Sequence, residues 1–139
     1  EQRSDFLVIA VCRIANASDH MVVIADPSKQ VERLGKFPLP VEVTPFGYTI
    51  TAKLVYDVLA ASGIDRPRVE LRSLSNGELV VTDGGNHILD CHCGRIPDAE
   101  ALAARLSNVP GVVEHGLFIG LARTVIIGNE NGATVFEFS

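Results

Sequence analysis

The chain has 139 residues, a net charge of −5 and a hydrophobic fraction of 47%. This length predicts one domain or two small lobes, and the apolar content argues against a disordered chain. The acidic balance disfavours nucleic-acid binding, which needs a basic face. No apolar run reaches the roughly 20 residues that span a bilayer, so we expect no membrane segment. The odd set Cys12, Cys91 and Cys93 favours reduced thiols in a cytoplasmic protein over a disulfide framework.

The first part of the chain predicts one buried strand followed by a short helix. Residues 21–25 are continuously apolar, which is typical of a strand buried on both faces of a parallel sheet. Residues 28–34 are expected to form a helix that Gly35 ends. The two prolines of residues 37–40 predict an extended linker. The chain opens at Glu1 and its one methionine is Met21, which indicates a processed chain, a fragment or an expressed segment.

The middle of the chain alternates predicted strands and helices. Strands are expected at 41–43, 69–74, 79–93 (with a turn at 83–86) and 112–119, and helices at 48–61 and from Pro97 to about Leu106. This βαββαβ order is the ferredoxin-like arrangement, an antiparallel sheet with both helices on one face. Residues 124–127 and 134–138 flank a turn sequence and predict a terminal hairpin. A lone parallel-type strand needs neighbours, which segments N-terminal to this chain would normally supply.

Four segments resemble type A ribose-5-phosphate isomerases, in order and at suitable spacing over residues 13–139. They are Val-Val-Ile-Ala-Asp-Pro-Ser-Lys (22–29), Leu-Gly-Lys-Phe-Pro-Leu-Pro-Val-Glu-Val (34–43), Thr-Asp-Gly-Gly-Asn-His-Ile-Leu-Asp (82–90) and Pro-Gly-Val-Val-Glu-His-Gly-Leu-Phe (110–118). The resemblance implies a fold of mixed class, α/β plus α+β. Residues 1–36 and 120–139 would be the remnant of a Rossmann-like catalytic lobe, and 37–119 an inserted ferredoxin-like lobe.

The resemblance also implies a reaction and one binding residue. The family interconverts ribose 5-phosphate and ribulose 5-phosphate through an enediolate, without metal or cofactor, by moving a proton with a carboxylate. Its phosphate-contacting lysine matches Lys29, which follows a buried strand where α/β sheets bind ligands. The bland alternative is a solvated lysine at a helix start.

Other functional elements of the family have no counterpart here. The Gly-Thr-Gly-Ser-Thr phosphate loop, the Asp-Gly-Ala-Asp-Glu segment and the Lys-Gly-Gly-Gly loop are missing, and Val11 stands where the catalytic glutamate is expected. The catalytic residues are therefore unknown, and we expect the chain alone to be inactive. The alternative is a non-catalytic ferredoxin-like binding or oligomerisation module. Apolar edges left without cover predict a homo-oligomer.

The remaining reactive residue types are interpreted structurally. Cys91-His92-Cys93 in a strand would place the two thiols on one side and the histidine on the other, which favours buried thiols over a metal site. Cys12 is expected in a core. The residues expected to be structural or at the surface are His20, His87, His115, Asp90 and Glu114, and Asp83-Gly84-Gly85-Asn86 is expected to form a turn.

Overall fold

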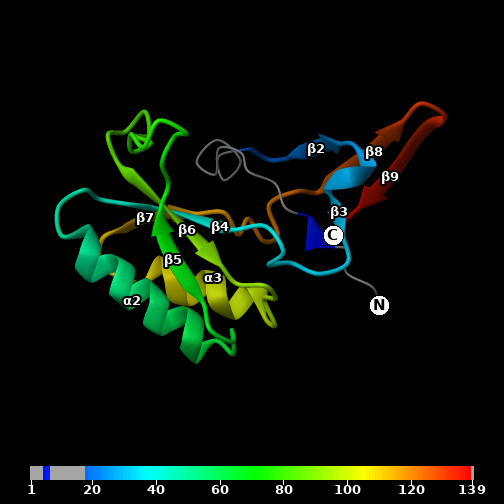
Figure 1. Cartoon of the computed structure of the whole chain (residues 1–139). Coiled ribbons are helices and arrows are strands. Elements are labelled where there is room, and N and C mark those ends of the chain that lie inside the picture. The colour runs from blue at the N-terminus through cyan, green and yellow to red at the C-terminus, as the bar shows by residue number, and fades with distance from the viewer. Residues whose placement is uncertain (1–4, 7–17, 139) are drawn as a thin grey trace. The chain divides into compact units, whose positions relative to one another are not determined.

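The computed structural model describes residues 5–6 and 18–138 and divides the chain into two compact units. The central unit is residues 33–117. The terminal unit takes residues 1–32 and 118–139, so the chain leaves it and returns to it. Figure 1 shows the elements of both units, and each unit is described by itself.

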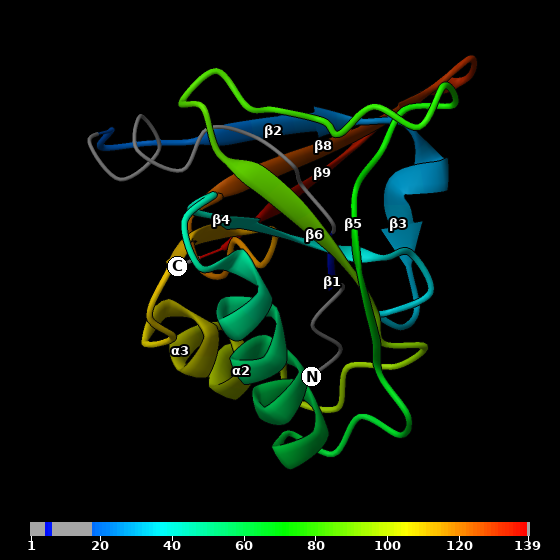
Figure 2. The ribbon, with the colours of Figure 1, turned by 60° about the vertical axis from the view of Figure 1, so that its left-hand side comes forward.

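The central unit is a four-stranded sheet covered on one face by two helices (Figures 1 and 2). Its elements are β4 (Leu39–Val43), α2 (Tyr48–Ala61), β5 (Arg68–Leu71), β6 (His87–His92), α3 (Ala99–Ser107) and β7 (Val112–His115). The strand order is β5-β6-β4-β7, and every neighbouring pair is antiparallel. The predicted βαββαβ order is therefore confirmed for this unit, which has the ferredoxin-like arrangement.

The core of the central unit lies between the sheet and the helices. Strand β4 alternates, so that Leu39, Val41 and Val43 are all buried on the helical side. Leu89 and Cys91 of β6 lie on the same side. The fully buried helical residues that meet them include Val55, Leu59, Leu102 and Leu106. Burial of such side chains stabilises each by roughly 1.5–3 kcal/mol relative to exposure.

The two helices are bounded by local signals. The Asp98 carboxylate accepts a hydrogen bond from the Ala101 backbone N–H at 2.9 Å and caps the start of α3. Helix α2 begins after Gly47, whose φ is +69°. Its end is closed by backbone hydrogen bonds from Ser62 to Val58 and Leu59. The predicted range of α2, residues 48–61, is confirmed.

The terminal unit contains a three-stranded sheet of order β2-β8-β9. Its strands are β2 (Val22–Ala25), β8 (Thr124–Asn129) and β9 (Gly132–Glu137), and a further antiparallel pair joins β1 (Asp5–Phe6) to β3 (Gln30–Val31). Strands β2 and β8 are parallel, whereas β8 and β9 form the predicted antiparallel hairpin. Val23, Val125 and Ile127 make a small core on one face of this sheet.

Two predictions for the segment before the central unit are wrong. Strand β2 is not buried on both faces, because it is an edge strand in the described sheet and Ile24 is 75% exposed. Residues 28–34 do not form a helix. A single 3₁₀ turn, η1 (Pro27–Lys29), is followed at once by strand β3. Val31 is β-branched and pairs with Asp5 of β1, which favours extended backbone there.

Three further boundaries differ from prediction in the central unit. The expected linker at 37–40 ends early, since Leu39 and Pro40 already belong to β4. Residues 79–82 form isolated bridges rather than a continuous strand. Strand β7 stops at His115, and the next residue, Gly116, lies so close to Pro40 that a Cβ there would be 2.8 Å from the Pro40 ring.

Gly111 provides a test of close packing in the central unit. Its φ of +88° and that of Gly77, +87°, strain any L side chain about equally. A Cβ at position 111 would collide with the Thr51 side chain, whereas nothing lies within 4 Å at position 77. We expect Gly111→Ala to lower the free energy of unfolding by about 2–4 kcal/mol and Gly77→Ala by about 1 kcal/mol. Equal losses in urea denaturation of the two variants would contradict this packing.

Candidate functional site

Lys29 lies directly after the carboxyl end of strand β2. The Asp26 carboxylate accepts a hydrogen bond from the Ser28 backbone N–H at 2.8 Å, and the Lys29 N–H donates to the Asp26 carbonyl at 3.1 Å. Pro27 at the first position of the turn has its φ fixed by its ring. The backbone of Lys29 is therefore held at the end of the strand by a short capped turn.

The surroundings of Lys29 suit an anion. Its side chain is exposed, and no ion pair joins its ammonium group to another residue of the described ranges. The hydrogen bonds from Ser28 hold the pKa of Asp26 below its ordinary value, and the charge of Lys29 adds to this effect. Asp26 is thus an anion at neutral pH whose carboxylate is hydrogen-bonded to Ser28. Within the described residues no ion pair occupies the Lys29 ammonium, which therefore suits a bound phosphate.

The carboxyl end of β8 lies at the same edge of the sheet as Lys29. The two strands are parallel, with Ala25 beside Ile127, and η1 packs against β8. Beyond β8, the Asn129 side chain accepts a hydrogen bond from the Asn131 backbone N–H at 2.9 Å and shapes the hairpin turn. This edge is where open α/β sheets bind ligands. Val11 and Cys12 lie outside the described residues.

A second polar cluster stands on the outer face of the central sheet. The Glu42 carboxylate accepts hydrogen bonds from the Thr82 hydroxyl at 2.7 Å and from the Asn86 side-chain amide at 3.0 Å. Gly85 has a φ of +78°, and its N–H donates to the Thr82 carbonyl, so residues 82–86 form the predicted turn. Glu42 therefore ties this turn to the central strand. Sequence reasoning gave Glu42 no role, although its place between Val41 and Val43 indicates the outer face.

Asp90 and Glu114, also in strands of the outer face, are held by local partners. The Arg72 guanidinium donates to the Asp90 carboxylate at 2.6 and 3.1 Å. The Glu114 carboxylate accepts a hydrogen bond from the His115 backbone N–H. These partners fit the structural interpretation of both acids.

His115 is buried and structural. The Leu117 N–H donates to its Nδ1 at 3.3 Å, so Nδ1 is unprotonated and the ring proton lies on Nε2. That proton is donated to the Ser107 hydroxyl at 3.0 Å, which in turn donates to the Ala103 carbonyl. The ring thereby links β7 to helix α3.

The other histidines are also engaged with nearby groups. His20 is hydrogen-bonded to the Thr124 hydroxyl at 2.9 Å, and the His87 ring packs edge-on against Tyr48. Among the described residues, no group of His, Cys, Asp or Glu is arranged to hold a metal ion. No helix in the described part of the chain is long and apolar enough to cross a membrane.

Comparisons with known proteins match nearly the whole chain. The family model of ribose 5-phosphate isomerase A (phosphoriboisomerase A) matches residues 12–132. The chain belongs to the ribose 5-phosphate isomerase A family. The isomerase A of Maricaulis maris is 58% identical over 125 residues, which are 89% of this chain and 54% of that protein. The chain spans about half the length of the curated relatives it matches.

Solved isomerase structures agree with the fold. The enzyme from Methanocaldococcus jannaschii has a TM-score of 0.75 and 34% identity, covering 90% of this chain and 52% of that one. A D-ribose-5-phosphate isomerase in complex with phospho-erythronic acid has a TM-score of 0.72 and 32% identity, covering 86% and 50%.

The four isomerase segments divide into two groups by their contacts. Three of them build the central unit. Glu42 of the second contacts Thr82 and Asn86 of the third, and Gly116 of the fourth packs on Pro40 of the second. The first segment, which ends at Lys29, lies in the terminal unit. Three of the four segments therefore lie in the central unit, apart from the last residue of the fourth, and the remaining one carries the candidate binding residue.

The Cys91-His92-Cys93 run is arranged as predicted. Both thiols are buried and free, while His92 lies on the other side of the strand, 3.3 Å from Glu70. Burial raises the pKa of the Cys93 thiol to about 11. Burial also raises the pKa of Cys91, with a further increase from the neighbouring Cys93 and Asp90. Neither thiol is a thiolate nucleophile at neutral pH.

This burial predicts low thiol reactivity and a loss of stability in alkali. In a Cys12→Ser variant, we expect dithiobis(nitrobenzoate) to modify neither of the two remaining thiols in the folded chain, and both of them in guanidinium chloride.

The pKa values of Cys91 and Cys93 are higher in the folded chain than in the unfolded chain. The protonated thiols therefore contribute fully to stability below the unfolded pKa of about 8.5, and this contribution falls as the pH rises toward 11. Cys93→Ala should reduce that alkaline loss. Rapid modification of the folded variant at pH 7 would contradict the burial.

Proposed function

We propose that this chain is the C-terminal part of a ribose-5-phosphate isomerase and that Lys29 binds the phosphate of the sugar. The observation that carries this proposal is the position of Lys29, exposed and held by the Asp26 cap at the carboxyl end of β2. The similar structure in complex with phospho-erythronic acid supports it, because that ligand presents a phosphate and a carboxylate, which an ammonium group attracts.

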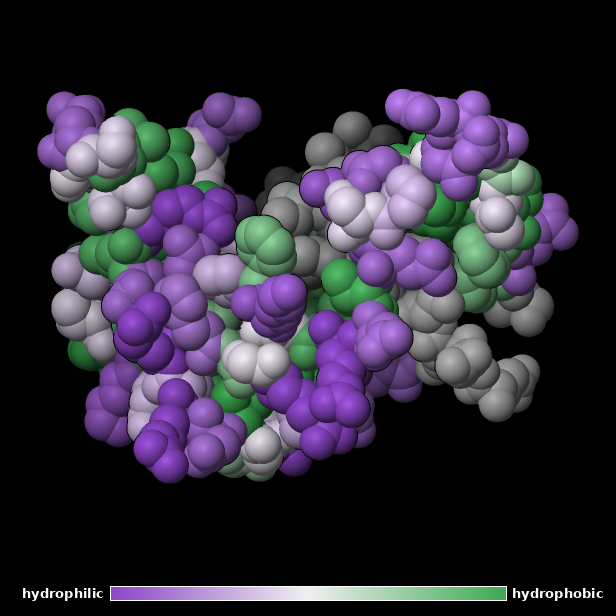
Figure 3. Space-filling model, turned by 45° about the vertical axis from the view of Figure 1, so that its right-hand side comes forward, coloured by the Kyte–Doolittle hydropathy of each residue, from purple (hydrophilic) through white to green (hydrophobic). Residues whose placement is uncertain are grey.

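The proposal assigns the two lobes different roles. Residues 1–36 and 120–139 would belong to a Rossmann-like catalytic lobe, and 37–119 to the inserted ferredoxin-like lobe. Parallel pairing of β2 with β8 supports the first assignment, because a Rossmann-like sheet is mostly parallel and has helices on both faces. Val22 and Ile24 of β2 are exposed on the face opposite the small core, which fits a sheet that further strands and helices would extend and cover. Figure 3 shows hydrophobic residues at the surface among hydrophilic ones.

The proposed reaction is an aldose–ketose interconversion. A base removes a proton from C2 of ribose 5-phosphate, the enediolate forms, and a proton is returned at C1 to give ribulose 5-phosphate. Lys29 would hold the phosphate at the far end of the sugar and so position the reacting carbons. The family glutamate that moves the proton aligns with Val11, whose side chain cannot accept one. We therefore infer that this chain alone does not catalyse the reaction.

We also propose a cytoplasmic setting for this reaction. The reaction class requires no cofactor, and its substrates are small sugar phosphates. Free, buried thiols at Cys91 and Cys93 support a cytoplasmic location, where cysteines stay reduced.

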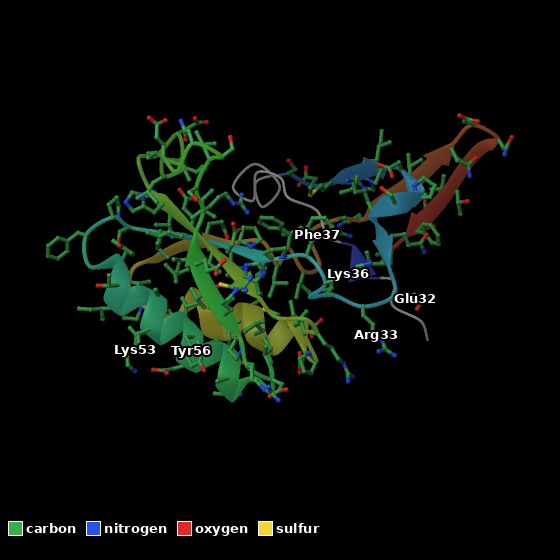
Figure 4. All side chains as sticks on the ribbon, viewed as in Figure 1. Glu32, Arg33, Lys36, Phe37, Lys53 and Tyr56 are labelled. Carbon is green, nitrogen blue, oxygen red and sulfur yellow. The ribbon has the colours of Figure 1, made fainter. Side chains whose placement is uncertain are left out.

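Substrate binding tests the role of Lys29. In isothermal titration calorimetry, we expect ribose 5-phosphate to bind the chain weakly. We expect Lys29→Ala to raise the dissociation constant at least about tenfold, because a charge-assisted hydrogen bond is lost. Lys53→Ala is the matched control, because Lys53 is an exposed lysine that projects from helix α2 of the central unit (Figure 4). Equal effects of the two substitutions would contradict a specific phosphate site at Lys29.

Measuring the conversion of ribose 5-phosphate tests whether this chain alone lacks catalytic activity. We expect no measurable conversion of ribose 5-phosphate by the purified chain. When the chain is coexpressed with the N-terminal half of the Maricaulis maris relative, we expect conversion to appear and to fall with Lys29→Ala. Robust conversion by the chain alone would overturn the proposal.

A second candidate function rests on the central unit, whose sheet and hydrophobic core are both formed by residues 33–117 alone. That unit could serve as a non-catalytic binding or oligomerisation module. Ribose 5-phosphate binding that depends on Lys29 supports the isomerase, whereas a folded chain without such binding supports the module.

A further inference from the structure

Two Asn-Gly pairs lie in exposed turns of the chain. Asn76-Gly77 follows strand β5 in the central unit, and Asn131-Gly132 lies at the turn of the β8–β9 hairpin in the terminal unit (Figure 1). Every other asparagine of the sequence is followed by a residue with a side chain. Because glycine has no Cβ, its backbone nitrogen can approach the preceding asparagine side chain with little steric hindrance.

The chemistry open to such a pair is an intramolecular deamidation. The glycine nitrogen attacks Cγ of the asparagine, so that an N–Cγ bond forms, the Cγ–Nδ2 bond breaks, and ammonia leaves with the proton of the glycine N–H. Water then opens the cyclic imide at either carbonyl and gives aspartate or isoaspartate. The net change adds water and releases ammonia, so no oxidant or cofactor is needed. The reaction does require a side chain that can turn and a glycine N–H that can lose its proton.

Hydrogen bonds restrain the Asn76 side chain at both of its polar atoms. Its Oδ1 accepts from the Glu78 backbone N–H at 3.0 Å, and its Nδ2 donates to the Glu78 carboxylate at 3.0 Å. The Gly77 N–H, which would supply the attacking nitrogen, donates to the Leu74 carbonyl at 2.9 Å. Attack at Asn76 would break these bonds, and the negative charge of Glu78 opposes the loss of a proton nearby.

The Asn131 side chain has no such restraint within the described part of the chain. Its backbone N–H donates to the Asn129 side chain at 2.9 Å, but no hydrogen bond to another described residue holds its own amide group. Gly132 begins β9 with a φ of +141°, and nothing lies within 4 Å of the position that a Cβ would take. In the described sheet β9 pairs with β8 alone, so the end of the hairpin opens at little cost.

We propose that Asn131 is a site of spontaneous deamidation in the folded protein, and that Asn76 is protected although the same residue follows it. The product places a new carboxylate in the turn beyond the carboxyl end of β8. Its isoaspartyl form also adds a backbone carbon to the two-residue turn between Asn129 and Gly132, whose length sets the hairpin register. This modification does not depend on isomerase activity or on Lys29.

Peptide mapping of the full chain by mass spectrometry tests the difference between the two sites. After incubation at mildly alkaline pH, we expect the peptide containing Asn131 to convert at least about tenfold faster than the peptide containing Asn76, since opening a hairpin end costs less than breaking three hydrogen bonds. In guanidinium chloride, which removes both turns, the two rates should agree within about threefold. Equal rates in the folded chain would overturn the proposal. So would an unchanged Asn131 in the folded chain while the denatured chain reacts.

Removing one carboxylate tests the protection of Asn76 directly. Glu78→Ala deletes the acceptor of the Asn76 amide and should speed conversion at Asn76 several-fold in the folded chain. Glu130→Ala is the matched control, because Glu130 is an exposed carboxylate beside Asn131 with no hydrogen bond to its side chain. It should leave the rate at Asn131 within about twofold of the native value. Circular dichroism verifies that both variants fold, and an unchanged Asn76 rate in folded Glu78→Ala would contradict the protection.

Discussion

The structure of the central unit depends on strand β4 being paired on both sides and buried on one face. It hydrogen-bonds to β6 and β7, and the side chains of Leu39, Val41 and Val43 are at most 2% exposed. The outer face of the same strand carries Glu42, which anchors the turn at residues 82–86. One strand of five residues thus fixes the register of the sheet, the position of both helices above it and the turn on its outer face.

The terminal unit is organised by a different constraint. Its sheet has a small core, and Lys29 is placed by the capped turn that follows β2 rather than by packing of its own side chain. The backbone of Lys29 is therefore fixed by the turn, while its exposed side chain forms no ion pair with another residue that the structure describes. This arrangement of a fixed backbone and an exposed ammonium group underlies the proposal that Lys29 binds a phosphate.

Sequence reasoning predicted the central unit well because local and long-range signals agree there. Alternation in 41–43 and the Asp98 cap each act in the same direction as the packing. It failed where the signal was ambiguous. An apolar run such as Met21–Ala25 fits an edge strand as well as a buried one, because the run says nothing of how many neighbours the strand has. Periodicity also could not separate the buried Val55 and Leu59 of α2 from the exposed Ile50. The Glu42 cluster was missed, since contacts between Glu42 and residues 40 and 44 positions away leave no local pattern.

The pairing of β2 with β8 determines when each part of the protein can form. Val22 lies opposite Thr124 in the parallel pair, although the two residues are about 100 positions apart, so this pairing closes a very long loop of chain. The central unit is a continuous segment that ends at Leu117, and all of its strands are available before β8 is made. During synthesis the middle of the chain can therefore fold first, while β2 waits without its partner strand until the C-terminal hairpin leaves the ribosome.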